Sequence, residues 1–176
     1  MICEGARFDA LRNAIYHSSR KAFYDWWNRF LSFVIIISGA AAIADFATTV
    51  AWPGWLWSPA LFPVIATFAA AIQLVFDLGG KSAKHAYLQR RYYELIADMQ
   101  REGVKDEDPK WEARLMNIYA DEPPPKRALD AIAYNAACEA IGAKSEKRVQ
   151  IRWYQSLLRH WLPFNKSDFP YVKASG

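Results

Sequence analysis

Long apolar stretches and charged stretches follow one another along the chain and hardly mix. Residues 30–50 (FLSFVIIISGAAAIADFATTV) and 57–78 (WSPALFPVIATFAAAIQLVFDL) form runs of 21 and 22 residues whose only charged members are Asp45 and Asp77. A bilayer core about 30 Å thick needs about 20 helical residues, and a soluble buried helix is rarely so long without a polar face. The pattern therefore predicts two transmembrane helices.

The segment between the two runs predicts a tight turn bordered by tryptophans. Residues 51–56 read AWPGWL, and the Pro-Gly pair is typical of a turn. Tryptophan is enriched where a helix leaves the hydrocarbon core. The predicted membrane-interface anchors are Trp26, Trp27, Trp52, Trp55, Trp57, Trp153 and Trp161.

The basic residues predict the orientation of this hairpin. Of the 22 Lys and Arg residues, 17 follow residue 79, the other five precede residue 30, and the turn has none. The positive-inside rule then places both termini in the cytoplasm. We reject a cleaved signal peptide for the first run, because its apolar region would span only about 7–15 residues.

Helical periodicity outside the two runs predicts a helical cytosolic part. Helices are expected over residues 6–29, 81–102, 109–120, 126–142 and 147–162. The apolar stripe of the first comprises Phe8, Leu11, Ile15, Ala22 and Trp26, and that of the second Leu88, Tyr92, Leu95 and Met99. We expect these two stripes to pack together. The predicted fold is all-α, with an N-terminal cytosolic helix (1–29), a transmembrane helical hairpin (30–78) and a cytosolic helical bundle (79–176).

The last predicted helix, residues 147–162, mixes aromatic and basic residues. Its apolar members include Trp153, Leu157 and Trp161, and its basic members include Arg152 and Arg159. Such a face is typical of a helix on a membrane surface. Docking on the other cytosolic helices explains it equally well, and both interpretations stay open.

No arrangement of residues in the sequence is typical of an enzyme. His17, His85 and His160 lie on separate segments without a carboxylate or cysteine at metal-binding spacing. We expect no catalytic residue, no metal and no cofactor, and structural or surface roles for the histidines. The net charge of +4 follows from the bases beside the membrane rather than from a nucleic-acid partner.

Polar residues inside the two apolar runs say more about function than the histidines do. Helical spacing places Ser38, Asp45 and Thr48 on one face of the first run, and Gln73 and Asp77 on one face of the second. A buried acid costs about 2.5–3.5 kcal/mol unless it is neutral, paired or wetted. These five residues are therefore candidates for a helix–helix seam or for the lining of a water-filled path in an oligomer of hairpins.

Several stretches together resemble a known family. NAIYHSSRKAFYDWWNRF leads into the first run, ISGAAAIADF lies within it, QLVFDLGGKSAKHAYLQRRYYEL ends the second, and YADEPPPKRALDAIAYN follows. Over about residues 7–142 this architecture resembles the SLATT family of two-transmembrane effector domains. The resemblance implies a bacterial inner-membrane effector of a defence or nucleotide-signalling system, activated by a sensor protein, with no catalytic residues.

The leading expectation is a self-assembling, homo-oligomeric effector that forms a pore or disrupts the bacterial inner membrane. The alternative is a non-conducting membrane anchor or scaffold whose cytosolic helices bind a partner protein. A phage holin fits less well, because holins are usually short and about 96 residues follow the second run.

Overall fold

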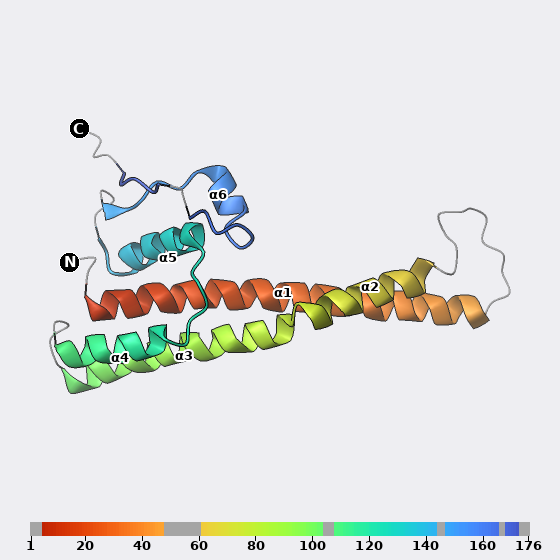
Figure 1. The fold of residues 1–176 in the computed structure, drawn as a ribbon, viewed down its shortest axis with the longest axis horizontal. Helices are drawn as coiled ribbons and strands as arrows, with labels where there is room; N and C mark the ends of the chain where they lie inside the picture. Colours follow the sequence, from red (N-terminus) through yellow and green to blue (C-terminus); the bar gives the residue numbers. More distant parts are fainter. Residues whose placement is uncertain (1–4, 48–60, 104–107, 144–146, 166–167, 173–176) are drawn as a thin grey trace. The chain divides into compact units, whose positions relative to one another are not determined.

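The protein is all-α over the residues that the computed structural model describes, which are 5–47, 61–103, 108–143, 147–165 and 168–172 (Figure 1). In α1 the side chains are described as far as residue 43. The helices are α1 (Ala6–Ala47), α2 (Leu61–Val75), α3 (Leu78–Glu102), α4 (Pro109–Tyr119), α5 (Arg127–Ala140) and α6 (Trp153–Leu157). The prediction of an all-α fold is thereby confirmed for this part of the chain.

The chain divides into two compact units. Met1–Arg20 and Lys84–Gly176 form the first, which we call the bundle unit, and Lys21–Ala83 form the second, the hairpin unit. Both α1 and α3 are continuous across the division.

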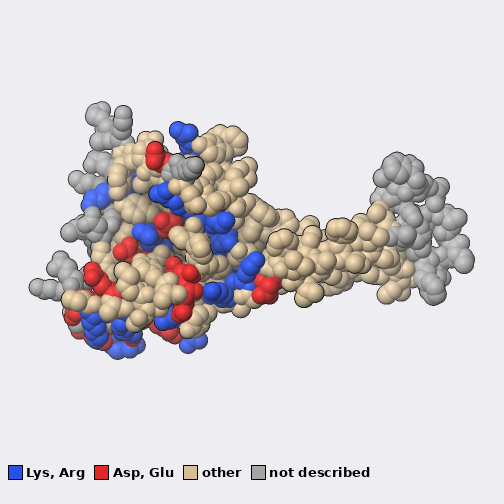
Figure 2. All heavy atoms as spheres, in the orientation of Figure 1, with Lys and Arg blue, Asp and Glu red and all other residues tan. Residues whose placement is uncertain are grey.

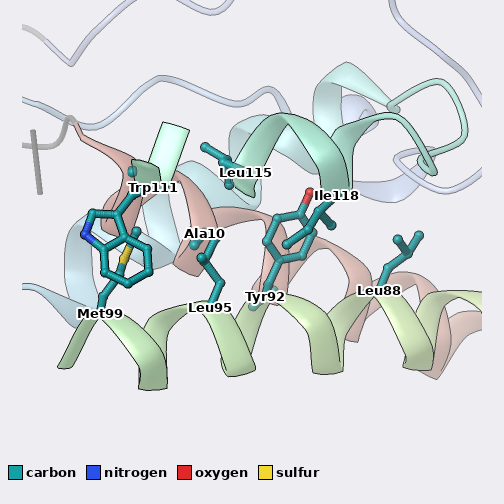
Figure 3. Packing of buried hydrophobic residues seen from close by; sticks show 10 residues of the cluster. Ala10, Leu88, Tyr92, Leu95, Met99, Trp111, Leu115 and Ile118 are labelled. Atoms are coloured by element: carbon teal, nitrogen blue, oxygen red, sulfur yellow. The ribbon is translucent and has the colours of Figure 1, made fainter. Parts of the chain in front are cut away.

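The main core of the bundle unit forms where α3 meets α1 and α4 (Figure 3). The α3 stripe of Leu88, Tyr92, Leu95 and Met99 is buried, as its spacing of three and four predicts. It packs against the small side chains of Ala6, Ala10 and Ala14 on α1 and against Trp111, Leu115 and Ile118 on α4. Alanines on α1 leave the room that the large α3 and α4 side chains fill.

A second core lies on another face of α1. Phe8, Leu11 and Ile15 pack against α5 around Ala137 and Cys138. The prediction that this stripe packs against the α3 stripe is therefore wrong. Because α1 is covered by α3 and α4 as well as by α5, its alanines contact the first group and its large apolar residues contact the second.

Local sequence signals explain where α4 and α5 begin and end. The carboxylate of Asp108 accepts the N–H of Lys110 at 2.9 Å, and Pro109 occupies the first turn of α4, where its missing N–H costs nothing. Beyond α5, Gly142 adopts φ of +69°, a conformation that favours glycine, and the N–H of Ala143 bonds back to Cys138 at 2.8 Å.

The predicted helix over residues 147–162 is wrong in extent, because α6 is only five residues long. Val149 pairs with Tyr171 in an isolated antiparallel bridge, and the Asn135 side chain bonds to both the N–H and the carbonyl of Val149 at 2.8 Å. These partners hold the backbone before Arg152 extended. The side chain of Gln155 then accepts the Arg152 N–H at 2.9 Å at the start of α6.

In the hairpin unit α2 packs against α1 and ends at a break in the backbone. Leu31 of α1 and Ala69 of α2 are buried together with Leu78, the first residue of α3. Asp77 has φ of 44°, and its carboxylate accepts the Gly80 N–H at 3.1 Å. The break therefore precedes Gly79 and Gly80 rather than falling on them.

Candidate functional site

Two helical stretches of the protein are long and apolar enough to cross a membrane. They lie in Ala6–Ile43 and Leu61–Glu102, and only 11% of the most apolar window of each is buried within the chain. A core helix of a soluble protein would be mostly buried. α2 has no charged residue, and charged atoms are absent from its described surface on the face drawn in Figure 2.

The outward surfaces of these helices consist of large apolar side chains. Exposed members on α1 include Phe33 (61%) and Ile43 (72%), and on α2 Phe68 (69%) and Leu74 (83%). Monomeric soluble proteins rarely expose so much contiguous apolar surface. This surface defines the class of the protein: an all-α chain with two candidate membrane helices.

A polar seam joins the two helices inside this apolar surface. The amide nitrogen of Gln73 on α2 donates to Asn28 Oδ1 at 2.6 Å and to Ser32 Oγ at 3.0 Å, both on α1. Near the start of α3, Ser82 Oγ donates to Asp25 Oδ1 at 2.5 Å. These polar side chains thus hydrogen-bond to one another across the helices of one hairpin. Polar groups in a low-dielectric environment need such partners.

The residues predicted to form a helix–helix seam differ in burial. Ser38 is buried at 5% exposure, and Gln73 is half-buried in the polar seam. Asp77 is exposed and borders a shallow hollow with Ala70 and Gly79. The side chain of Asp45, and Thr48 altogether, lie outside the described residues. Gln73 lines the same hollow as Asp77, and its hydrogen bonds add Asn28 and Ser32 to the seam.

The predicted tryptophan anchors are also distributed over both units. In the hairpin unit Trp26 is 58% exposed and stacks on Phe30, with ring centroids 5.4 Å apart, whereas Trp27 is partly buried against α2 and α3 residues. In the bundle unit Trp153 and Trp161 are exposed. Trp52, Trp55 and Trp57 lie outside the described residues.

A buried polar chain in the bundle unit is absent from the sequence-based predictions. The Nδ1 atoms of His17 and His85 lie 2.8 Å apart, and His17 Nε2 lies 2.8 Å from Glu122 Oε1. That oxygen also accepts the hydroxyl of Tyr92, whose ring stacks on His17. Sequence spacing gives no sign of this pairing, because Glu122 lies 105 positions after His17. We call these four residues the histidine chain.

Burial and the short contacts limit what the histidine chain can do chemically. His17 and Tyr92 are fully buried and His85 is 4% exposed, so no substrate reaches the ring nitrogens. No group of three His, Cys, Asp or Glu residues in the described ranges could hold a metal ion. The chain therefore joins α1, α3 and the segment after α4 through hydrogen bonds.

Two histidines, His85 of the histidine chain and His160, make the stability of the bundle unit depend on pH. Burial, the nearby His17 and the positive charges of Arg20 and Lys84 lower the pKa of His85 from 6.5 to about 3. Burial together with Arg159 and Arg20 lowers the pKa of His160 to about 4. In the folded protein both rings thus stay neutral at pH 5, whereas the unfolded chain binds protons there.

Between pH 6.5 and the folded pKa the unfolded state binds more protons, so stability falls as the pH is lowered. We expect the free energy of unfolding to fall by about 1.4 kcal/mol per pH unit for each histidine below pH 6.5. Urea titrations of the full chain in detergent at pH 7, 6 and 5 measure this slope. His85→Asn should lower this slope by the contribution of one histidine, about 1.4 kcal/mol per pH unit. An unchanged slope in that variant would show that His85 is not one of the groups that bind protons on unfolding.

No family model, curated protein or solved structure matches this chain. The class of the protein therefore depends on its own helices and contacts.

Proposed function

We propose that the protein is a two-span membrane protein that assembles with copies of itself and breaches the bacterial inner membrane. The observation that carries the proposal is the pair of long apolar helices, of whose most apolar windows only 11% is buried. Lipid is the environment that such exposed apolar surface requires. The bases that border the hairpin, Arg20 and Lys21 before it and Lys81 and Lys84 after it, support cytoplasmic termini.

Two features of the hairpin unit support self-assembly. The hollow beside Ala70 and Gly79 offers small residues to a neighbouring helix, and small residues permit close helix packing in lipid. Asp77 lies exposed at its edge. An enclosed aqueous path requires more than one hairpin, because two helices cannot surround water. The resemblance to SLATT effectors supports the same function and adds a sensor protein as the trigger.

Depolarisation of cells tests the proposed function. We expect overexpression of the full chain in bacteria to collapse the membrane potential, measured with a voltage-sensitive dye. Asp45→Ala should weaken the collapse while the protein still fractionates with membranes, because Asp45 is the acid placed deepest in the first run. Thr67→Ala is the matched control, since Thr67 is exposed and its hydroxyl donates to the carbonyl of Pro63 on its own helix at 2.8 Å.

An unchanged membrane potential at high expression would contradict a membrane-breaching function. It would favour the second candidate, an anchor or scaffold that holds a partner protein. The bonds from Gln73 to Asn28 and Ser32 support that candidate, because they satisfy these polar groups within one copy. Light scattering of the full chain in detergent separates the two functions: a ring of many copies supports the effector, and a monomer supports the anchor.

A further inference from the structure

The segment from Trp153 to Leu162 presents apolar side chains outward from the bundle unit. Trp153 is 78% exposed, Leu157 70%, Trp161 58% and Leu162 45%. We call these four residues the aromatic patch. They lie within ten consecutive positions, whereas Gln155, between the first two, is buried. The side of α6 that faces the protein is therefore already covered, and Trp153 and Leu157 lie on its opposite side.

Hydrogen bonds from three basic residues hold the backbone of this segment in place. Arg20 donates to the carbonyl of His160 at 2.9 Å, and Lys126 Nζ to that of Trp161 at 3.2 Å. Arg127 donates through its backbone N–H to Pro163 at 3.2 Å and through its guanidinium to Asn165 at 2.7 Å. The outward display of the patch is thus built into the fold and does not result from a loose end.

The charges around the aromatic patch are all positive along the chain. From Arg148 to Asn165 there are three arginines and no acid. Arg152 is exposed and Arg159 half-exposed, while Lys126 lies beside the Trp161 carbonyl. A surface of tryptophan and leucine bordered by arginine and lysine is typical of proteins that bind anionic lipid. Its apolar side chains lie at the boundary between the headgroups and the acyl chains.

We propose that the aromatic patch docks on the surface of an anionic lipid bilayer. This inference rests on the proposed membrane hairpin, because Arg20, which bonds to His160, precedes Phe30 by ten residues on the unbroken helix α1. Under that proposal the bond from Arg20 ties the segment to a residue ten positions before the first apolar run. The basic rim is complementary to anionic headgroups and selects this occupant over a neutral apolar protein surface.

Spin-label accessibility in liposomes tests the docking. Full chain with Cys3→Ser is labelled at Leu157→Cys, at Met116→Cys or at Ile37→Cys. Cys138 is buried, and the variant with Cys3→Ser alone serves to measure any label that it takes up. Met116 is the matched control, since it is 61% exposed on α4. In phosphatidylglycerol-containing liposomes we expect position 157 to be accessible to oxygen and protected from a water-soluble nickel reagent, and position 116 to show the reverse. Arg152→Gln and Arg159→Gln should each lower the docked-to-undocked ratio at position 157 about fivefold.

The other outcomes overturn the proposal in distinguishable ways. Water-like accessibility at position 157 with lipid-like accessibility at position 37 refutes docking and leaves the hairpin intact. Protection of position 157 from both reagents, lost when each liposome holds a single copy, shows that a second copy of the chain covers the patch. Water-like accessibility at position 37, which is 51% exposed on α1, refutes the membrane hairpin itself.

Discussion

Replacing Glu122 by leucine is expected to lower the free energy of unfolding of the bundle unit by about 2–6 kcal/mol. Glu122 Oε1 lies 2.8 Å from His17 Nε2 and accepts the Tyr92 hydroxyl. Both partners are buried, and each buried polar group left without its partner costs about 1–3 kcal/mol. Urea unfolding of the full chain in detergent, followed by far-ultraviolet circular dichroism, measures the change.

The neighbouring carboxylate provides the control for Glu122. Asp121 pairs with Arg91, but its side chain is 56% exposed. An exposed ion pair contributes only about 0–1 kcal/mol, so Asp121→Leu should change stability little. Equal losses in the two variants would show that the buried acceptor is not what stabilises the histidine chain.

Trp111→Ala should destabilise the bundle unit by about 3–5 kcal/mol, the range for removing a buried large aromatic side chain. Trp111 is fully buried in the core formed by α1, α3 and α4 (Figure 3). Its loss leaves a cavity beside Met99 and Ala10 that those side chains cannot fill. The urea concentration at the midpoint of unfolding should fall in proportion to the lost free energy of unfolding.

Two further variants test whether the loss of stability comes from the cavity left by the Trp111 side chain. Met116→Ala on the same helix removes a side chain that is 61% exposed and should change stability by no more than about 0.5 kcal/mol. Within the described residues the indole N–H of Trp111 has no hydrogen-bond acceptor, so Trp111→Phe should lose less stability than Trp111→Ala. A loss in Trp111→Phe as large as in Trp111→Ala would contradict the cavity explanation.

Local pattern was sufficient for the helices before residue 143 and for the buried face of α3. The α3 stripe through Leu88 and Tyr92 is buried at the positions that a period of 3.6 residues predicts. His85 continues that stripe three residues before Leu88, so its burial could have been predicted from the same spacing. The pairing of His85 with His17 could not, because the two residues lie 68 positions apart and no local rule relates them.

Two errors have a common physical cause. The helix α1 is covered on more than one side, but alanines at positions 6, 10 and 14 give a weak hydrophobic signal beside Phe8 and Leu11. The helix predicted before Trp153 does not form, because Val149 bonds to the Asn135 side chain and pairs with Tyr171. In each case contacts between distant segments decide the outcome, and the seam formed by Gln73, Asn28 and Ser32 is a third example.

The unbroken course of α1 has a consequence for its backbone. From Ala6 to Ala47 the helix has no interruption, so its interior N–H groups are satisfied within the helix itself, as a low-dielectric surrounding requires. The path from α2 to α3 instead passes through Asp77, whose φ of 44° interrupts the helix, and there the Asp77 carboxylate accepts the Gly80 N–H.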